Sequence, residues 1–185
     1  MSAAQTNWMD AAARLDAGLY AALAQRRSPR LDVAMRRLSH AADYSRLSLG
    51  SAAVLALVGG PRGRSAALQG LAGVGVTATL VNLAVKPLTR RARPDRDRYR
   101  VPETRHVRMP ISTSFPSGHT AAAVAFATGA ARVWPATGVP LGALALAVGY
   151  SRVHTGVHYP GDVLAGGLIG AGLALLTSRA LDDRS

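Results

Sequence analysis

A nearly continuous run of apolar residues constrains the fold of this chain more than any other feature of its sequence. The run covers residues 66–85 and is about as long as a helix must be to cross the hydrocarbon core of a bilayer. The amide of Asn82 lies inside the run, and we expect it to hydrogen-bond to a neighbouring helix. Because Lys86 precedes a proline, we expect the helix to end or bend there.

The composition favours a membrane location. Of the 185 residues, 49% are hydrophobic and only 5% are aromatic, and small side chains of this kind allow close helix packing in lipid. The net charge of +12 would also suit a protein that binds nucleic acid. However, the basic residues flank the apolar runs and no stacking aromatics are interleaved with them. We therefore expect membrane lipids, and no nucleic acid, as partners.

The cysteine and lysine contents add two further constraints. The chain contains no cysteine, which excludes disulfides and thiolate metal sites. Lys86 is the single lysine among 22 basic residues, which suggests a specific role for it. The length predicts one domain, residues 1–185.

The pattern of apolar segments predicts an all-α, integral-membrane bundle of about six helices, five of them transmembrane. The N-terminal segment, residues 1–30, contains a helix over 6–26 that is too polar to span, and we expect it to lie in the membrane interface. The alternative is a helix packed on a soluble core. We expect Ala and Leu on one side of this helix, the charges of Asp10, Arg14 and Asp16 on the other, and Trp8 and Tyr20 as interface anchors.

Residues 31–185 form the predicted helical core. A second helix begins near Leu31 and becomes apolar over 47–60, and a short turn over 61–64 leads into the apolar run. Three further helices follow, over 118–134, 139–153 and 161–180, and their glycines and short lengths predict tilt.

Gly166 and Gly170 form a GxxxG pair in the last predicted helix. We interpret the pair as a packing surface within the bundle, with dimerisation as the less favoured alternative. Whether the chain forms a homodimer cannot be determined from the sequence.

Three short stretches carry the residues that suit chemistry: residues 86–94 (KPLTRRARP), 116–119 (PSGH) and 151–162 (SRVHTGVHYPGD). A polar, Arg-rich connection over 89–117 joins the first two, and loops of this length are usually functional or disordered. Because the five predicted crossings alternate in direction, all three stretches fall at one membrane face.

The cations and the helix start in these stretches suit phosphate binding. Lys86, Arg93 and Arg152 could surround a phosphate and the charge on its oxygens. Ser117 and Gly118 stand at a predicted helix N-terminus, where free backbone N–H groups favour an anion. Gly118 has no side chain, so an anion can approach the backbone there closely.

The histidines and the carboxylate suit phosphoryl transfer. His158, oriented by Asp162, would attack phosphorus and form a phosphohistidine. His119 would protonate the departing oxygen and then activate water. No carboxylate cluster suited to magnesium accompanies these residues, so we expect neither a metal nor another cofactor.

Each feature also has a simpler interpretation. The basic residues near 86–94 could anchor a helix end at the interface, and the PSGH stretch could be a helix start capped by Ser117. A His and an Asp close in sequence often share only a surface hydrogen bond. The conjunction of three stretches at one face favours the chemical interpretation.

The three stretches resemble the signature of the type 2 phosphatidic acid phosphatase superfamily, which includes lipid phosphatases, soluble acid phosphatases and vanadium haloperoxidases. The matches are K-x6-R-P at 86–94, P-S-G-H at 116–119 and S-R-x5-H-x3-D at 151–162. The resemblance implies a helical bundle and a metal-free phosphohistidine mechanism. It implies His158 as nucleophile, Asp162 as its orienter and His119 as acid and base. The implied phosphate site consists of Lys86, Arg93, Ser117, Gly118 and Arg152.

His40, His106 and His154 match no signature position, and we expect them to be structural or solvent-facing.

The leading functional hypothesis is a membrane phosphatase that acts on a lipid phosphate or diphosphate, either polyprenyl-linked or a glycerophospholipid. One alternative is a phosphatase acting on a polyprenyl-phosphoryl pentose 5-phosphate in cell-wall synthesis. Two others are a vanadate-dependent haloperoxidase-like enzyme and a non-enzymatic protein that binds anionic lipids through its Arg-rich loop. The sequence does not name the lipid.

The resemblance implies a multi-pass protein of the bacterial inner (plasma) membrane. The distribution of arginines predicts that its active site lies at the cytoplasmic face, because Arg-rich short loops stay cytoplasmic. Apart from the motif cations, the predicted site face carries fourteen arginines, seven before residue 47 and seven within 89–117. The opposite face carries five: Arg62, Arg64, Arg132, Arg179 and Arg184.

Overall fold

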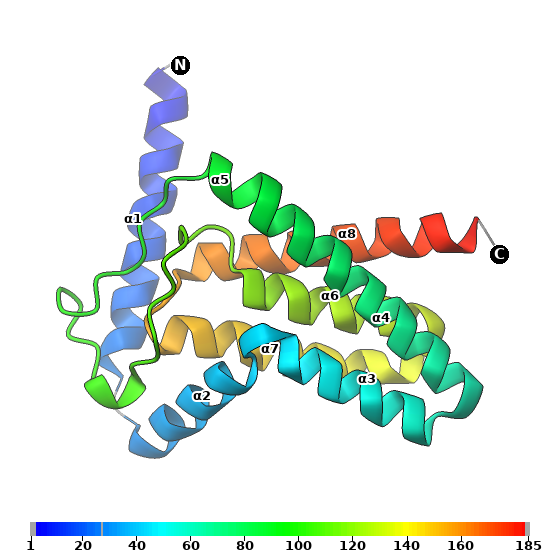
Figure 1. Ribbon diagram of the computed structural model, residues 1–185. Coiled ribbons are helices and arrows are strands. Elements are labelled where there is room, and N and C mark those ends of the chain that lie inside the picture. Colours follow the sequence, from blue (N-terminus) through cyan, green and yellow to red (C-terminus); the bar gives the residue numbers. More distant parts are fainter. Residues whose placement is uncertain (1–2, 27, 184–185) are drawn as a thin grey trace.

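The computed structural model describes residues 3–26 and 28–183. Within these residues the regular structure is entirely helical (Figure 1). Helices α3 (Arg46–Val58), α4 (Gly60–Leu80), α6 (Gly118–Val133), α7 (Gly138–His154) and α8 (Pro160–Asp182) run side by side as a bundle. The predicted all-α helical bundle is confirmed.

Helix α6 lies at the centre of the bundle and packs against α4, α7 and α8. Its inward side consists of small residues, and Ala121, Ala125 and Ala130 are fully buried. Phe126 is the large side chain of the main core cluster and is also buried. Small side chains therefore bring the backbones of neighbouring helices close to α6.

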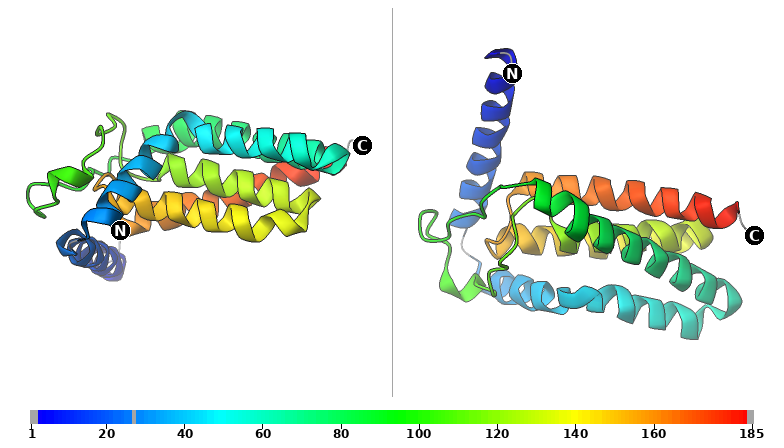
Figure 2. Two further views of the ribbon diagram at one scale, coloured as in Figure 1. Left: turned by 90° about the horizontal axis from the view of Figure 1, so that it is seen from below. Right: turned by 45° about the horizontal axis from the view of Figure 1, so that its top comes forward.

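Helix α1 (Ala3–Gln25) lies across one end of the bundle, where it contacts α7 and α8 (Figure 2). Leu15 and Leu19 are exposed on it. The prediction that Asp16 and Tyr20 face outwards was wrong, because both side chains are buried against the rest of the protein. The outer surface of α1 carries these leucines together with the exposed Asp10 and Arg14, and a surface of both kinds suits a helix that lies in the membrane interface.

The predicted continuous helix over residues 31–60 is instead broken in two. Helix α2 (Pro29–Ala41) ends before a short 3-10 turn (Asp43–Ser45), and α3 begins directly after the turn. Tyr44 and Ser45 both have a φ of 56°, in the left-handed region that non-glycine residues rarely occupy. The sequence contains no glycine or proline here to indicate the break.

The predicted turn at residues 61–64 was also misplaced. The chain turns at Gly59 and Gly60, where Gly60 has a φ of 54°, and residues 61–64 already belong to α4. Pro61 stands in the first turn of that helix, where its missing N–H has no helical partner to lose.

The end of α4 departs from the prediction at Lys86. The helix widens into a π-helical turn (Val81–Val85) and continues as α5 (Lys86–Leu88) before the loop begins. Proline removes a backbone donor and crowds the preceding turn, and a wider turn accommodates both effects. The Asn82 amide donates to the carbonyl of Ala78 at 2.9 Å. It therefore bonds its own helix and not a neighbour, contrary to the prediction.

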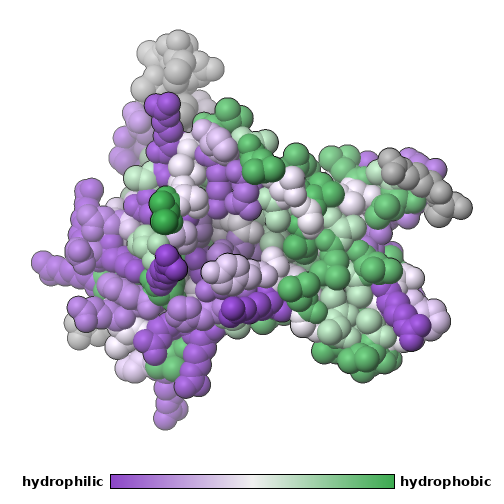
Figure 3. Space-filling view, viewed as in Figure 1, coloured by the Kyte–Doolittle hydropathy of each residue, from purple (hydrophilic) through white to green (hydrophobic). Residues whose placement is uncertain are grey.

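On the face that Figure 3 shows, apolar side chains lie mostly over the bundle, while polar residues gather at the end that carries the loop and α2. Among the described residues, the helices over Gly60–Leu88 and Pro160–Asp182 are long and apolar enough to cross a membrane. Helices α3, α6 and α7, packed beside them, have 13, 16 and 17 residues, fewer than the roughly 20 of an ordinary span. The prediction that α3, α6 and α7 cross the membrane therefore rests on their packing beside these two helices and not on their own length.

The GxxxG pair packs inside the bundle, as expected. A Cβ atom on Gly170 would lie 2.2 Å from the carbonyl oxygen of Ala121, and one on Gly166 would lie 2.5 Å from that of Ser117. Helix α8 therefore touches the backbone of α6 along this stripe of glycines.

The glycine contact yields a matched test of stability. Gly170→Leu should lower the free energy of unfolding by at least about 2 kcal/mol, because overpacking must separate α6 from α8. Gly172→Leu should be tolerated, since nothing lies within 4 Å of a Cβ atom at that position. Thermal unfolding of both variants in detergent measures the difference, and equal stabilities would contradict the proposed contact.

Candidate active site

The three stretches singled out in the sequence meet at the polar end of the bundle. The connection over residues 89–117 lies across this end, beside the N-termini of α6 and α8 and the C-terminus of α7 (Figure 1). The backbone N–H of Ser117 donates to the carbonyl of Asp162 at 2.9 Å, and that of Ser114 donates to the carbonyl of Arg91 at 2.9 Å. Backbone hydrogen bonds therefore join the second stretch to the third, and the first stretch to Ser114 in the loop just before the second.

His158 lies in the connection between α7 and α8 with its ring almost completely buried. Its Nδ1 is 3.5 Å from Oδ2 of Asp162, and its Nε2 is 3.2 Å from a guanidinium nitrogen of Arg93. A guanidinium can only donate, so Nε2 accepts and the ring proton resides on Nδ1, facing the carboxylate. Burial lowers the pKa of His158 to about 4, although the neighbouring Asp162 opposes the shift. The imidazole is therefore neutral at pH 7, with its lone pair on Nε2.

Asp162 stands in the first turn of α8 and its side chain is fully buried. Oδ2 accepts from the hydroxyl of Ser114 at 2.5 Å and from the backbone N–H of Tyr159 at 2.9 Å. Oδ1 accepts from Arg91 at 2.8 Å. A carboxylate held by this many donors is fixed in orientation and stays ionised.

Arg93 covers His158 from the side of the loop. Its guanidinium donates to the carbonyls of Ser112 at 2.9 Å and Val157 at 2.7 Å, besides its contact with the His158 ring. The loop and the α7–α8 connection therefore hold this cation directly against the imidazole.

Lys86, Gly118 and His119 line a cleft of about 180 Å³ between α3, α4 and α6. Lys86 Nζ donates to the Ser112 hydroxyl at 3.2 Å. A Cβ atom on Gly118 would lie 3.6 Å from Nζ, so glycine leaves the space beside the ammonium open. The rest of the cleft is mostly apolar or small and includes Leu47, Ala78, Val81, Ala122, Ala123 and Val148.

Ser117 caps α6. Its buried hydroxyl lies 2.9 Å from that of Thr120 and also accepts from the Thr120 N–H at 3.5 Å. The backbone N–H groups of Gly118 and His119 have no hydrogen-bond partner among the described residues. The helix start therefore offers its backbone, and not the serine hydroxyl, to an anion.

Arg152 and His119 converge on a carboxylate that sequence reasoning missed. His119 Nε2 lies 2.9 Å from Oδ1 of Asp43, and an Arg152 nitrogen lies 3.9 Å from the same oxygen. Arg152 is buried, donates to the Ser39 hydroxyl at 2.6 Å, and leaves its Nε without a partner among the described residues. Asp43 reaches this position through the left-handed corner between α2 and α3.

His154 is structural, as expected. Its Nε2 lies 2.8 Å from Oδ1 of Asp32, which also accepts from Nε of the fully buried Arg105 at 2.8 Å. This cluster fastens the loop to α2 and α7. His106 lies against the carbonyl of Val101 within the loop, and His40 is exposed near Asp43. Among the described residues, no group of three or more His, Asp or Glu side chains could hold a metal ion.

Fold and site together define a class: membrane helical bundles that gather cations and two histidines at one end, beside an apolar cleft. The chain belongs to the PAP2 superfamily, whose family model matches residues 67–185.

Two solved structures share the fold. The transmembrane PAP2-type phosphatidylglycerolphosphate phosphatase of Bacillus subtilis aligns with a TM-score of 0.69 and 26% identity, covering 94% of this chain and 87% of that one. LpxE of Aquifex aeolicus aligns with a TM-score of 0.70 and 24% identity, covering 89% of this chain and 95% of that one.

Curated relatives match shorter parts of the chain. Decaprenylphosphoryl-5-phosphoribose phosphatase of Mycobacterium tuberculosis is 38% identical over 122 residues, which is 64% of each chain. Lipid A 1-phosphatase of Rhizobium johnstonii is 45% identical over 65 residues, which is 35% of this chain and 27% of that protein.

Proposed function

We propose that this protein is a lipid phosphatase that hydrolyses a phosphomonoester or diphosphate through a phosphohistidine intermediate. The observation that carries the proposal is the cleft, in which Lys86, Gly118 and His119 stand among mostly small or apolar side chains. Such a cleft suits a charged headgroup joined to a hydrocarbon chain. The names of the relatives, all phosphatases of lipid-linked phosphates, support the same activity.

The phosphate binds between the cations Lys86, Arg93 and Arg152 and the free N–H groups at the start of α6. Its oxygens take the place of His158 as partners of Arg93, which leaves the Nε2 lone pair facing phosphorus. Nε2 forms a bond to phosphorus while the bond to the leaving oxygen breaks, and the positive charge on the ring is stabilised by Asp162. The three cations stabilise the charge on the equatorial oxygens.

His119 supplies the proton transfers. It gives a proton to the leaving oxygen, then takes one from the water that attacks the phosphohistidine, which releases inorganic phosphate and restores His158. Asp43, 2.9 Å from Nε2, holds the ring in place. The negative charge of the bound phosphate favours the protonated form of the ring, which the first proton transfer requires. The scheme uses no metal and no cofactor.

The substrate class is a polyprenyl-linked or glycerophospholipid phosphate. A polyprenyl-phosphoryl pentose 5-phosphate is the finer candidate, supported by the likeness to the decaprenylphosphoryl-5-phosphoribose phosphatase over 64% of the chain.

Removal of the nucleophile tests the mechanism. His158→Ala should lower the rate of phosphate release from a polyprenyl phosphate by roughly a thousandfold or more, because no covalent route remains. His119→Ala should slow lipid release and let phosphoenzyme accumulate on an aryl phosphate, whose leaving group needs no proton. His106→Ala, in the loop, is the matched control and should stay near wild type.

The rate of phosphate release by the wild-type protein should survive EDTA. A loss of rate that magnesium restores would overturn the metal-free scheme.

The single lysine provides a second test. Lys86→Arg should lower kcat/KM by about tenfold or more, because a planar guanidinium cannot place its charge where the compact ammonium stands beside Gly118. Arg90→Lys is a suitable control, since Arg90 is exposed and bonds none of the described residues. Wild-type kinetics in Lys86→Arg would identify Lys86 as an anchor at the helix end.

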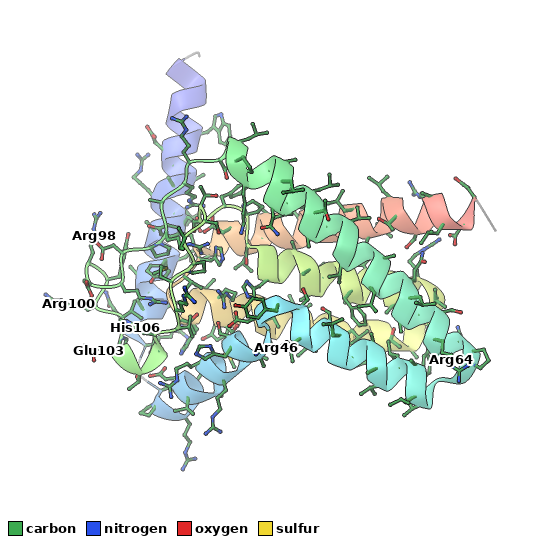
Figure 4. The ribbon with its side chains drawn as sticks, in the orientation of Figure 1. Arg46, Arg64, Arg98, Arg100, Glu103 and His106 are labelled. Atoms are coloured by element: carbon green, nitrogen blue, oxygen red, sulfur yellow. The ribbon has the colours of Figure 1, made fainter. Side chains whose placement is uncertain are left out.

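We propose that the active site lies at the cytoplasmic face. Arg98 and Arg100 lie in the loop at the polar end of the bundle, whereas Arg64 lies at the opposite end (Figure 4). Of the arginines in the predicted count, Arg27 and Arg184 lie outside the described residues. The other arginines in the count are still more numerous at the end of the bundle that carries the active site, and basic short loops stay in the cytoplasm.

Two cysteine substitutions in this cysteine-free chain test the orientation. Arg98→Cys should resist an impermeant maleimide in intact cells and react after permeabilisation. Arg64→Cys, at the other end, should be labelled in intact cells. The reverse pattern would place the site outside the cell.

A further inference from the structure

Arg91 lies outside the residues assigned above to nucleophile, acid or phosphate site, yet its guanidinium joins two carboxylates far apart in sequence. One terminal nitrogen donates to Oδ1 of Asp162 at 2.8 Å, and the other donates to Oδ2 of Asp16 at 2.5 Å. Asp16 belongs to α1, the helix that lies across the end of the bundle. Arg91 is thus a direct connection between that helix and the carboxylate behind His158.

The two carboxylates are held differently. The Asp162 side chain is fully buried, and Arg91 is the hydrogen-bond donor to its Oδ1 among the described residues. The Asp16 side chain is 11% exposed, and its Oδ1 accepts from the backbone N–H of Gly161 at 2.7 Å. The Arg91 guanidinium also stacks 4.5 Å above the ring of Tyr159, the residue that follows His158.

We propose that Arg91 is a positioning residue that ties α1 to Asp162 and thereby fixes the carboxylate against the His158 ring. The inference rests on the proposed phosphatase function. Arg91 itself touches neither the phosphate nor the reacting atoms.

The physical reason is that the two carboxylate oxygens of Asp162 have different hydrogen-bond partners. Oδ2 faces His158, Ser114 and the Tyr159 N–H, whereas Oδ1 is bonded by Arg91. A buried carboxylate oxygen without a donor is costly. Without Arg91, the carboxylate relieves that cost by turning Oδ1 towards the donors of Oδ2 or by taking up a proton. Either change weakens its hold on the imidazolium.

Lysine cannot replace this arginine. The planar guanidinium donates in two directions while its face stacks on Tyr159, whereas an ammonium is a single point of charge with no face to stack. Asp16, fastened to Gly161, keeps the guanidinium turned towards Asp162. The position of α1 therefore determines how firmly the carboxylate is oriented.

The test measures steady-state kinetics on a polyprenyl phosphate in detergent micelles. Arg91→Gln should lower kcat by about tenfold, comparable to the loss on removing a hydrogen-bond partner that orients a metal ligand, with KM nearly unchanged because the phosphate-binding cations remain. Arg91→Lys should lose nearly as much. Arg90→Gln, one residue away and exposed, is the matched control and should keep wild-type values. Wild-type kcat in Arg91→Gln or Arg91→Lys would overturn the proposal.

A double-mutant cycle separates positioning from general stabilisation. In an Asp162→Asn background, Arg91→Gln should cause no further loss of kcat, because its effect passes through that carboxylate. Independent, additive losses would overturn the proposal.

Asp16→Asn provides a second route if Arg91→Gln does not fold, since it keeps the arginine. It should lower kcat by a smaller factor at unchanged KM, and an unchanged kcat would count against the link to α1. An inactive wild-type protein would refute the phosphatase function itself and not the role of Arg91 within it.

Discussion

The close approach of α6 and α8 is the constraint on which the site depends. Gly166 and Gly170 bring α8 against the backbone of α6, and at the head of this contact the Ser117 N–H bonds the carbonyl of Asp162 at 2.9 Å. One stretch supplies the open helix start and His119, and the other supplies the carboxylate behind His158. Because the two helices meet through backbone atoms, the spacing of these groups depends little on side-chain rotamers.

A buried ionic cluster holds the loop over this site. Arg105 and His154 share the carboxylate of Asp32, which fixes the loop to α2 and α7. With Arg105 anchored in this way, the two parts of the loop on either side of it hold Arg93 against His158 and Ser114 against Asp162. The cost of burying these charges is offset by their mutual bonds, and the benefit is a fixed position for residues that would otherwise stand on a long, mobile segment.

Much of this arrangement could be predicted from the sequence. Lys86, His119, Arg152 and His158 lie at or near helix ends, so alternating crossings bring them to one face. The left-handed corner at Tyr44 and Ser45 carries no glycine or proline, and Asp43 was missed with it. The Asp32 partners stand 73 and 122 residues away in the chain, beyond any local pattern. Asp16 was assigned to the wrong side of α1 because it was grouped with Asp10 and Arg14, although a helix of 3.6 residues per turn places it about 200° around the axis from Arg14.

The contact between Arg93 and Nε2 of His158 has a consequence for selectivity. In the proposed mechanism the neutral imidazole is the nucleophile, yet its Nε2 atom is covered by a cation and the residue is 2% exposed. A neutral electrophile has no acceptor that could replace the imidazole as the hydrogen-bond partner of the guanidinium. A phosphate has such acceptors, because its oxygens accept hydrogen bonds from arginine better than a ring nitrogen does. Under the proposed mechanism, an anion must therefore draw Arg93 away from His158 before Nε2 can react, and the enzyme selects for charge before any bond to phosphorus forms.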